Sequence, residues 1–198
     1  MPKTSPETGG SWGIMGGAFD PIHRGHLKLA EQAFNEFNLD GVLFVVSFDP
    51  PHRNKPIASF DNRLKMAGLA LEKYDNFILS DIEKEISTPN FTINMINALK
   101  FKYPRVNWYL ILGEDNLAIF DIWYKPEEII RQVKVVVGNR PGSAIEKSKW
   151  DNKITRFEMT PIDISSTEIR RRIKAGEPVD NMVTDEVAEY IKLERLYL

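Results

Sequence analysis

Short apolar segments alternate along this chain with longer segments in which apolar residues recur at helical spacing. Gly, Pro, Asp or Asn bound the apolar segments, which predict strands at Trp12–Met15, Val42–Val46, Phe77–Ser80, Trp108–Leu112, Val133–Val137 and Ile154–Met159. The segments between them predict helices at about Gly25–Phe37, Phe60–Lys73, Thr92–Lys102, Asn116–Phe120 and Glu127–Arg131. This alternation is typical of α/β proteins.

Consecutive parallel strands need crossover helices on the faces of their sheet, so we predict a doubly wound parallel sheet. Ligands of such sheets bind beyond the carboxyl ends of the strands, which directs attention to the loops that follow them. Near the C-terminus, Ser165-Ser166-Thr167-Glu168 has the spacing of a capping box before a helix that carries Ile169 and Ile173. A second helix at about Thr184–Leu193 completes a small C-terminal helical extension.

The 198 residues, 42% of them hydrophobic, suffice for one good core, so we predict a single domain over residues 12–198. Residues 1–11 are rich in turn and polar residues and predict a disordered leader. A net charge of -2 provides no positive field for holding a nucleic acid, and no apolar run approaches membrane-spanning length. We therefore expect a soluble cytoplasmic protein without a nucleic-acid or membrane partner.

The residue types also restrict the chemistry. The sequence has no cysteine, which excludes disulfides, thiolate metal sites and a cysteine nucleophile. Its three histidines, His23, His26 and His52, are too few and too separated for an obvious zinc cluster. We predict no dedicated metal site.

The richest chemistry follows the first predicted strand, which runs directly into Gly16-Gly17. Glycine has no side chain, so the backbone at these two positions can approach a phosphate closely. His23 and His26 lie near the first turn of the next predicted helix, where backbone N–H groups and the helix dipole favour an anion. Two imidazoles there could donate hydrogen bonds to phosphate oxygens as charge develops in a transition state. An ordinary strand-to-helix turn with surface histidines is the simpler alternative.

The segment from Gly16 to His26 resembles the His-x-Gly-His signature of the nucleotidyltransferase superfamily. More closely, it resembles the Gly-Gly-x-Phe-Asp-Pro-x-His-x-Gly-His pattern of nicotinate mononucleotide adenylyltransferases. The resemblance implies a Rossmann-like fold, a mononucleotide contact by Asp20, and catalytic roles for His23 and His26. It implies an ATP site that includes Gly16, Gly17, Ala18, Phe19, His23, Gly25 and His26.

A second motif, Ile164-Ser165-Ser166-Thr167-Glu168-Ile169-Arg170, resembles the Ile-Ser-Ser-Thr-x-x-Arg signature near the end of the same family. The resemblance implies that Ile164, Ser165, Ser166 and Arg170 close on the β- and γ-phosphates of ATP. Arg170 can clamp phosphate oxygens in a forked geometry and would act in catalysis. Without the first motif, a capped amphipathic helix with a solvated basic face would explain the segment equally well.

Other segments resemble the family between these two motifs. Gly113-Glu114-Asp115, with Glu114 in place of the family's alanine, implies that Gly113 and Asp115 lie beside the adenosine, and Arg140-Pro141-Gly142 implies that Arg140 lies near ATP. The implied mononucleotide-binding residues are His52, Arg53, Phe91, Thr92, Trp123 and Tyr124. Residues Ile86–Thr88 depart from the family's Arg-x-Gly, and Phe91 or Trp123 could instead be ordinary core aromatics.

These motifs occur in the family's order over residues 12–175. The resemblance implies transfer of AMP from ATP to nicotinate mononucleotide, giving nicotinate adenine dinucleotide and pyrophosphate in NAD biosynthesis, with Mg²⁺ bound through the substrate phosphates. The alternatives are a pantetheine-phosphate adenylyltransferase, a cytidylyltransferase and a non-catalytic nucleotide-binding module. The preference for the acid or amide mononucleotide stays open, as does association into a homo-oligomer. The hypothesis requires both histidines and Arg170 to share one cleft.

Overall fold

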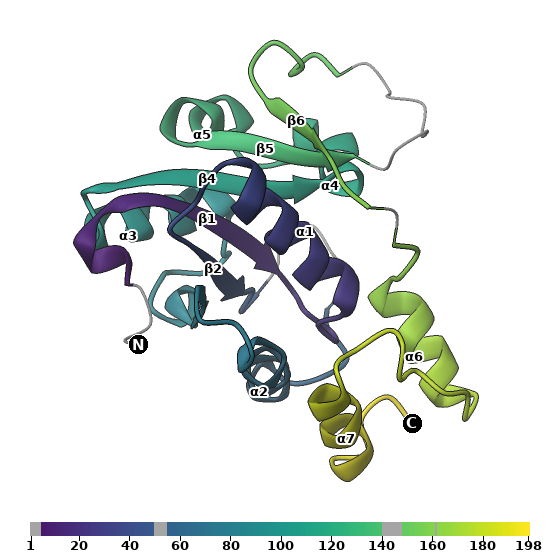
Figure 1. Ribbon diagram of the computed structural model, residues 1–198. Coiled ribbons are helices and arrows are strands. Elements are labelled where there is room, and N and C mark those ends of the chain that lie inside the picture. The colour runs from purple at the N-terminus through teal and green to yellow at the C-terminus, as the bar shows by residue number, and fades with distance from the viewer. Residues whose placement is uncertain (1–4, 50–54, 140–147, 161) are drawn as a thin grey trace.

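A six-stranded parallel sheet forms the centre of the computed structural model, which describes residues 5–49, 55–139, 148–160 and 162–198 (Figure 1). The order of strands is β3-β2-β1-β4-β5-β6, and every neighbouring pair is parallel. Their bounds are β1 Gly10–Gly17, β2 Gly41–Val46, β3 Phe77–Ser80, β4 Val106–Gly113, β5 Lys134–Asn139 and β6 Thr155–Glu158. The predicted doubly wound parallel sheet is confirmed.

Helices cover both faces of this sheet, so two apolar layers hold it. One layer packs beneath α1 Arg24–Glu36, α2 Phe60–Leu71, α6 Ser166–Lys174 and α7 Asp185–Leu193. The other layer packs beneath α3 Thr92–Lys102, α4 Glu114–Ala118 and α5 Pro126–Gln132. Three short 3-10 helices complete the described elements: η1 Pro6–Thr8, η2 Ile82–Lys84 and η3 Phe120–Ile122. Every residue of β2 is buried, as expected of a parallel strand covered on both faces.

The winding of the chain determines where a ligand can bind. From β1 the chain proceeds outward to β2 and β3, and it then returns to place β4 on the other side of β1. The crossovers from β1 and β4 thus leave in opposite directions, which opens a crevice at the carboxyl ends of these two strands. β1 ends at Gly17 and β4 at Gly113, so the predicted phosphate and adenosine motifs both begin at this crevice.

Residues 5–11, the described part of the N-terminal segment, differ from the prediction of a disordered leader over residues 1–11. Residues Pro6–Thr8 form η1, and β1 already begins at Gly10. Long-range contacts hold this segment: the Arg105 guanidinium donates to the Glu7 carbonyl, and Ser11 N donates to the Asp40 carboxylate. Such contacts come from the tertiary fold, and the local sequence pattern does not encode them.

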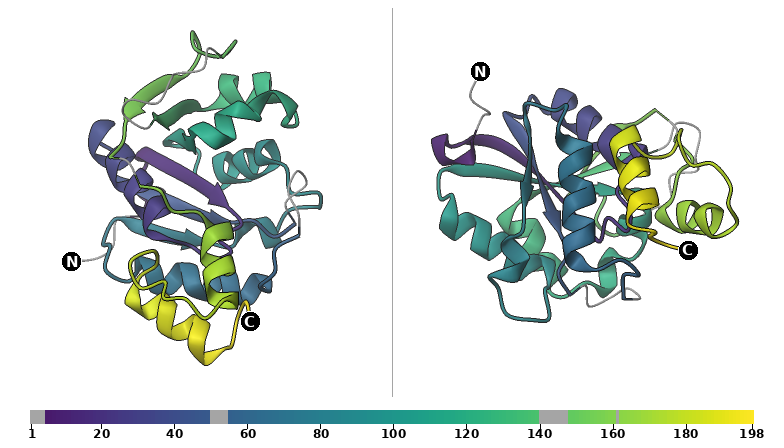
Figure 2. Two further views of the ribbon diagram at one scale, coloured as in Figure 1. Left: turned by 90° about the vertical axis from the view of Figure 1, so that its right-hand side faces the viewer. Right: turned by 90° about the horizontal axis from the view of Figure 1, so that it is seen from below.

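The C-terminal helices return the end of the chain to the sheet. α7 packs against α2, and α6 lies beside α7 in the views of Figures 1 and 2. Val187 and Ile191 of α7 enter the core, while the Tyr190 hydroxyl donates to Asn62 Oδ1 of α2 at 3.0 Å. The last residues consequently reach the loop between β1 and α1. No helix in the described part of the chain is long and apolar enough to cross a membrane.

Candidate active site

A cleft of about 1120 Å³ opens at the carboxyl ends of β1 and β4. The two histidines and Arg170 line it together, as the hypothesis required. Its lining contains every predicted site residue that the structure describes: Gly16, Gly17, Ala18, Phe19, Asp20, His23, Gly25, His26, Phe91, Thr92, Gly113, Asp115, Trp123, Tyr124, Ile164, Ser165, Ser166 and Arg170. Three predicted residues, His52, Arg53 and Arg140, lie outside the described residues.

His23 and His26 cap the start of α1 reciprocally. His26 N donates to His23 Nδ1 at 3.4 Å, and His23 N donates to His26 Nδ1 at 3.2 Å. The two rings stack with centroids 3.6 Å apart. Because each Nδ1 accepts a hydrogen bond, a neutral ring at either position carries its proton on Nε2. The pair therefore offers Nε2–H donors beside the backbone N–H groups of a helix start, which suits an anion.

The environment of His23 keeps its ring neutral and fixed in place. Burial lowers the pKa of His23 to about 4, so the ring is uncharged at neutral pH. A Cβ at position 25 would lie 3.0 Å from His23 Nδ1, which explains why this position is a glycine. On the other side, the Phe19 ring meets the His26 ring edge-on at 5.1 Å. Phe19 thus supports an imidazole as well as lining the cleft.

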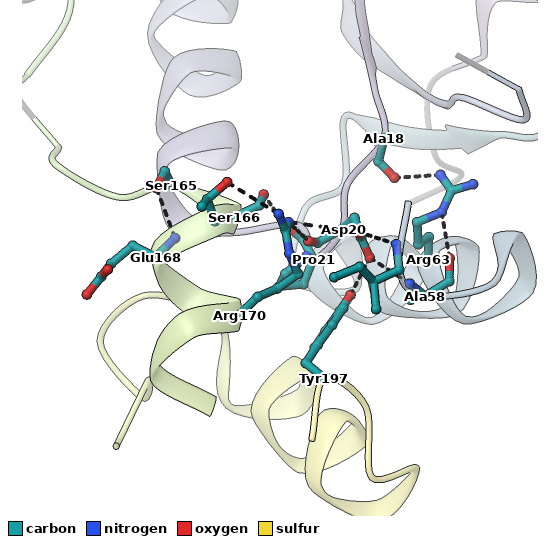
Figure 3. A network of polar contacts seen from close by, with 12 residues as sticks. Ala18, Asp20, Pro21, Ala58, Arg63, Ser165, Ser166, Glu168, Arg170 and Tyr197 are labelled. Carbon is teal, nitrogen blue, oxygen red and sulfur yellow. Dashed lines mark hydrogen bonds and ion pairs between the residues drawn. The ribbon is translucent and has the colours of Figure 1, made fainter. Parts of the chain in front are cut away.

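The start of α6 is tied directly to the loop of the first motif (Figure 3). The Ser166 hydroxyl donates to the Pro21 carbonyl at 2.9 Å, and Arg170 Nη1 donates to the Asp20 carbonyl at 2.7 Å. Ser165 caps the helix by accepting from Glu168 N at 3.2 Å. Two motifs about 140 residues apart in sequence are therefore one structural unit.

The predicted capping box at α6 is only half formed. The Ser165 hydroxyl accepts as expected, but the Glu168 carboxylate pairs with Arg171 and Arg172 along the helix. Those two guanidinium groups lie within reach at the spacings of three and four residues, and their charge attracts the carboxylate more strongly than a main-chain N–H does. This competition lowers the pKa of Glu168 to about 2, with the hydrogen bonds from Arg171 and Arg172 as the leading causes.

Asp20 is engaged inside the protein. The residue is 5% exposed, and its carboxylate accepts from Ile57 N at 2.8 Å, from Ala58 N at 3.0 Å and from the Tyr197 hydroxyl at 2.8 Å. Arg170 Nη1 also lies 3.8 Å from Asp20 Oδ2. The resemblance implied a contact between Asp20 and the mononucleotide, whereas the structure gives its side chain internal partners.

Arg63 is a residue at this site that the sequence reasoning missed. It is 2% exposed, and its guanidinium donates to the carbonyls of Ala18, Ser47 and Ala58 at 2.6, 2.8 and 3.3 Å, respectively. The loops that follow β1 and β2 are thus joined to the segment before α2. One signal could have revealed it: Arg63 occupies the buried face of α2 together with Met66, Ala67 and Ala70, where an apolar residue is expected.

Aromatic side chains line a second part of the cleft, which we call the ring end. The Phe91 ring at the start of α3 stacks on Tyr124 with centroids 4.4 Å apart, and Trp123 packs against Phe120 at 5.2 Å. Tyr124 is 45% exposed. Four ring systems from two segments therefore gather at a partly open surface, and three of them line the cleft: Phe91, Trp123 and Tyr124.

Two buried polar residues beside these rings were also missed. The Asn90 amide donates to the Glu83 carbonyl at 2.9 Å, and the Glu83 carboxyl accepts from Phe48 N at 2.9 Å. Burial raises the pKa of Glu83 to about 7. Within the described part of the chain, Asn90 Oδ1 is buried without a hydrogen-bond partner. Both residues line the cleft; Asn90 directly precedes the predicted Phe91 and Thr92, whereas no local motif distinguishes Glu83 in the sequence.

Glu114, which replaces the family's alanine, has a charged partner. Arg156 of β6 pairs with the Glu114 carboxylate and, at 3.0 Å, with Asp151 Oδ1. The Glu114 carboxylate therefore has a cationic partner within the protein. Among the described residues, no group of three or more His, Cys, Asp or Glu side chains could hold a metal ion.

Comparisons with known proteins agree on one family. Residues 14–172 match the family described as Cytidylyltransferase-like. The chain is 35% identical over 198 residues to a Carboxydothermus hydrogenoformans protein named "Probable nicotinate-nucleotide adenylyltransferase", covering 96% of this chain and 98% of that protein. A Caldicellulosiruptor saccharolyticus protein of the same name is 38% identical over 192 residues, covering 93% of this chain and 97% of its own.

A solved structure supports the fold. The Plasmodium falciparum nicotinic acid mononucleotide adenylyltransferase complexed with NaAD superimposes with a TM-score of 0.78, at 18% sequence identity, over 94% of this chain and 97% of that chain. At this identity the likeness establishes a shared α/β nucleotidyltransferase fold.

Proposed function

The chain belongs to the cytidylyltransferase-like family and, within it, to the nicotinate-nucleotide adenylyltransferases, and from this premise we propose that it transfers AMP from ATP to nicotinate mononucleotide. The products are nicotinate adenine dinucleotide and pyrophosphate, in NAD biosynthesis. The observation that carries this proposal is the convergence of His23, His26 and Arg170 on one cleft. Use of ATP fits the cytoplasmic location that the sequence predicts.

In this proposal the triphosphate of ATP lies between the starts of α1 and α6. The α1 start offers backbone N–H groups and two Nε2–H donors, while α6 offers Arg170. The Nδ1 atom of each ring is already used as an acceptor, so the Nε2–H of a neutral ring is the group that can donate to a phosphate oxygen. The adenosine then extends toward Gly113 and Asp115, and Arg140 remains a proposed ATP ligand.

The mononucleotide occupies the ring end of the cleft. Trp123 and Tyr124 offer flat surfaces on which a pyridine ring can stack, and Phe91 and Thr92 border the same space. His52 and Arg53 are proposed to meet its phosphate. This division places the two substrates end to end, with their phosphates toward the first motif.

The proposed reaction is an in-line displacement. The 5′-phosphate oxygen of the mononucleotide forms a bond to the α-phosphorus of ATP, and the bond from that phosphorus to the pyrophosphate oxygen breaks. No covalent bond to the protein is needed, so the chain contributes alignment and stabilisation of negative charge. His23 and His26 donate to phosphate oxygens through Nε2, and Arg170 neutralises charge on the leaving group.

Mg²⁺ is proposed to bind mainly through substrate phosphate oxygens and water. Two of the carboxylates that line the cleft, Asp20 and Glu114, already have internal partners, which suits a metal carried in by its substrate. Bound in that way, Mg²⁺ would supply additional neutralisation of the triphosphate.

Pyrophosphate release in the presence of ATP and Mg²⁺ tests the proposal. Nicotinate mononucleotide, nicotinamide mononucleotide and phosphopantetheine are supplied in parallel reactions, and CTP replaces ATP in a further one. We expect release with ATP and nicotinate mononucleotide. Greater release with phosphopantetheine or with CTP would assign the chain to another enzyme of the superfamily. ATP binding without release of pyrophosphate in the presence of any acceptor would indicate a non-catalytic nucleotide-binding module.

The same assay measures the preference between the acid and amide mononucleotides as a ratio of kcat/KM values. Size-exclusion chromatography with light scattering determines whether the chain forms a homo-oligomer under the assay conditions.

A further inference from the structure

The second-last residue of the chain, Tyr197, contacts Asp20 at the proposed phosphate end of the cleft, the part lined by Gly16, Gly17, His23, His26 and Arg170. The Tyr197 hydroxyl donates to Asp20 Oδ1 at 2.8 Å, and Figure 3 shows the ring pointing from the C-terminal segment toward this carboxylate. Tyr197 is 9% exposed. It therefore contacts the loop of the first motif from a position 177 residues away in sequence.

The conformation of this segment indicates that the contact is specific. Tyr197 has φ +67° and Arg195 has φ +52°, both in the left-handed region that residues with a side chain seldom adopt. A bulky residue held in that region needs compensating interactions. Burial and the neighbouring Asp20 charge raise the pKa of Tyr197 far above its usual range, so the hydroxyl remains a donor at every physiological pH.

Asp20 connects Tyr197 to Arg170 in the site. Its carboxylate holds Ile57 N and Ala58 N, and its main-chain carbonyl accepts from Arg170 Nη1 at 2.7 Å. Arg170 Nη2 also donates to Thr167 Oγ1 at 3.3 Å. A shift of Asp20 therefore moves an anchor of the Arg170 guanidinium.

We propose that Tyr197 is a positioning residue, which fixes Asp20 through its hydroxyl and thereby orients Arg170 toward the triphosphate. This inference rests on the proposed function, because Arg170 has to act on ATP. Tyr197 itself lies outside the residues that line the cleft. The internal use of the Asp20 carboxylate then replaces the direct mononucleotide contact that the resemblance implied.

A merely structural role for Tyr197 is the rival explanation, and the chain offers a matched control. Tyr190 also belongs to the C-terminal segment, and its hydroxyl donates one hydrogen bond to a neighbouring element, at Asn62 of α2. Tyr190→Phe removes that bond without touching Asp20 or Arg170. Tyr197→Phe keeps the buried ring and removes only the bond to Asp20.

The experiment measures steady-state kinetics of both variants in the full chain, together with their affinities for a non-hydrolysable ATP analogue. For Tyr197→Phe we expect kcat/KM for ATP to fall about tenfold, and KM for nicotinate mononucleotide to change less than about twofold. Tyr190→Phe should leave both parameters within about twofold of the wild type. Equal kinetics for the wild type and Tyr197→Phe, or equal losses in both variants, would overturn the proposal.

A double-mutant cycle tests the link to Arg170. Arg170→Lys keeps a positive charge without the forked geometry, so adding Tyr197→Phe to it should change kcat/KM for ATP less than about twofold. A full additional loss would show that Tyr197 does not act through Arg170. If Tyr197→Phe fails to fold, Asp20→Asn tests the same junction: a selective loss of kcat/KM for ATP supports the proposal, and no change contradicts it.

Failure of the proposed function is distinguishable from failure of this inference. A wild-type chain that releases no pyrophosphate with any mononucleotide contradicts the proposed function alone. The affinity for the ATP analogue still tests Tyr197 in that case, because the Arg170 contact requires no turnover: weaker binding by Tyr197→Phe alone supports the proposal, and equal binding by all three proteins contradicts it.

Discussion

The two ends of the cleft are built in different ways. At the phosphate end, helix starts, buried side chains and main-chain carbonyls hold one another through hydrogen bonds, from the His23–His26 pair to the Asp20–Arg170 junction. At the ring end, aromatic side chains stack at a partly exposed surface, as Phe91 does on Tyr124.

The difference fits the proposed division of the cleft between the two substrates. Charge develops on phosphate oxygens during the reaction, and donors that are already fixed stabilise it without reorganisation. A neutral ring gains mainly from contact area, which flat side chains provide with little directional constraint. Substitutions at the phosphate end should therefore reduce turnover, whereas substitutions at the ring end should mainly weaken binding of the mononucleotide.

His26→Ala should have the largest effect. Loss of one preorganised donor to the transition state lowers kcat by about 100- to 1000-fold, and the affinity for ATP should change little. Steady-state kinetics and titration of ATP measure the two quantities. Thr184→Ala is the matched control, since it removes the side-chain cap of α7 and should reduce stability without reducing kcat. Unchanged turnover in His26→Ala would reject its catalytic role.

Arg170→Lys should have the next largest effect. Lysine keeps the charge but cannot reproduce a forked contact with phosphate together with the bond to the Asp20 carbonyl, so kcat/KM for ATP should fall about 10- to 100-fold. Arg171→Lys changes a neighbouring surface guanidinium on the same helix and should leave the kinetics unaltered. Similar losses in both variants would point to a general disturbance of α6.

Trp123→Ala should separate the two ends of the cleft. Stacking on an aromatic ring contributes about 1–3 kcal/mol per base, so KM for the mononucleotide should rise roughly tenfold or more. KM for ATP should stay near the wild-type value in the same assay. A rise in KM for ATP alone would mean that the ring end has been assigned to the wrong substrate.

Glu83→Gln should have its clearest effect on stability rather than on turnover. Burial raises the pKa of Glu83 from 4.5 to about 7, so between these pH values the folded protein binds more protons than the unfolded chain. The contribution of Glu83 to the free energy of unfolding is therefore present at pH 4.5 and is lost as the pH rises through 7. The total loss is at most about 3 kcal/mol.

Glutamine cannot ionise, so the variant should gain stability relative to the wild type as the pH rises from 4.5 to 8. Denaturant unfolding at several pH values measures this difference. His23, whose lowered pKa acts in the opposite direction over about pH 4 to 6.5, is present in both proteins and cancels. A difference that stays constant with pH would contradict the assigned burial of Glu83.

The sequence predicted the sheet, most helices and the two phosphate motifs, because each depends on local spacing. β3 and α3 coincide with their predicted bounds, and the long apolar face of α2 was recognised despite its buried arginine. The connections between distant segments were not predictable in this way. The contacts of Arg63, Glu83 and Tyr197 form only when segments far apart in the sequence meet.

The phosphate end also shows how a local motif can be recognised while the partners of its side chains within the protein are not predictable. Asp20 lies in the recognised segment, yet its carboxylate serves the loop at Ala58 and the C-terminal Tyr197. Glu168 has the spacing of a capping residue, yet arginines on its own helix bind it. Spacing identifies which residues can interact, and the competition among partners decides which of them do.

A structure of the protein with a non-hydrolysable ATP analogue tests most directly whether the starts of α1 and α6 hold one triphosphate. We expect the phosphates to lie between these helices, with the Nε2 atoms of His23 and His26 and the Arg170 guanidinium within hydrogen-bond distance of their oxygens. Phosphates bound at the ring end of the cleft, or contacted by only one of the two helix starts, would contradict this arrangement.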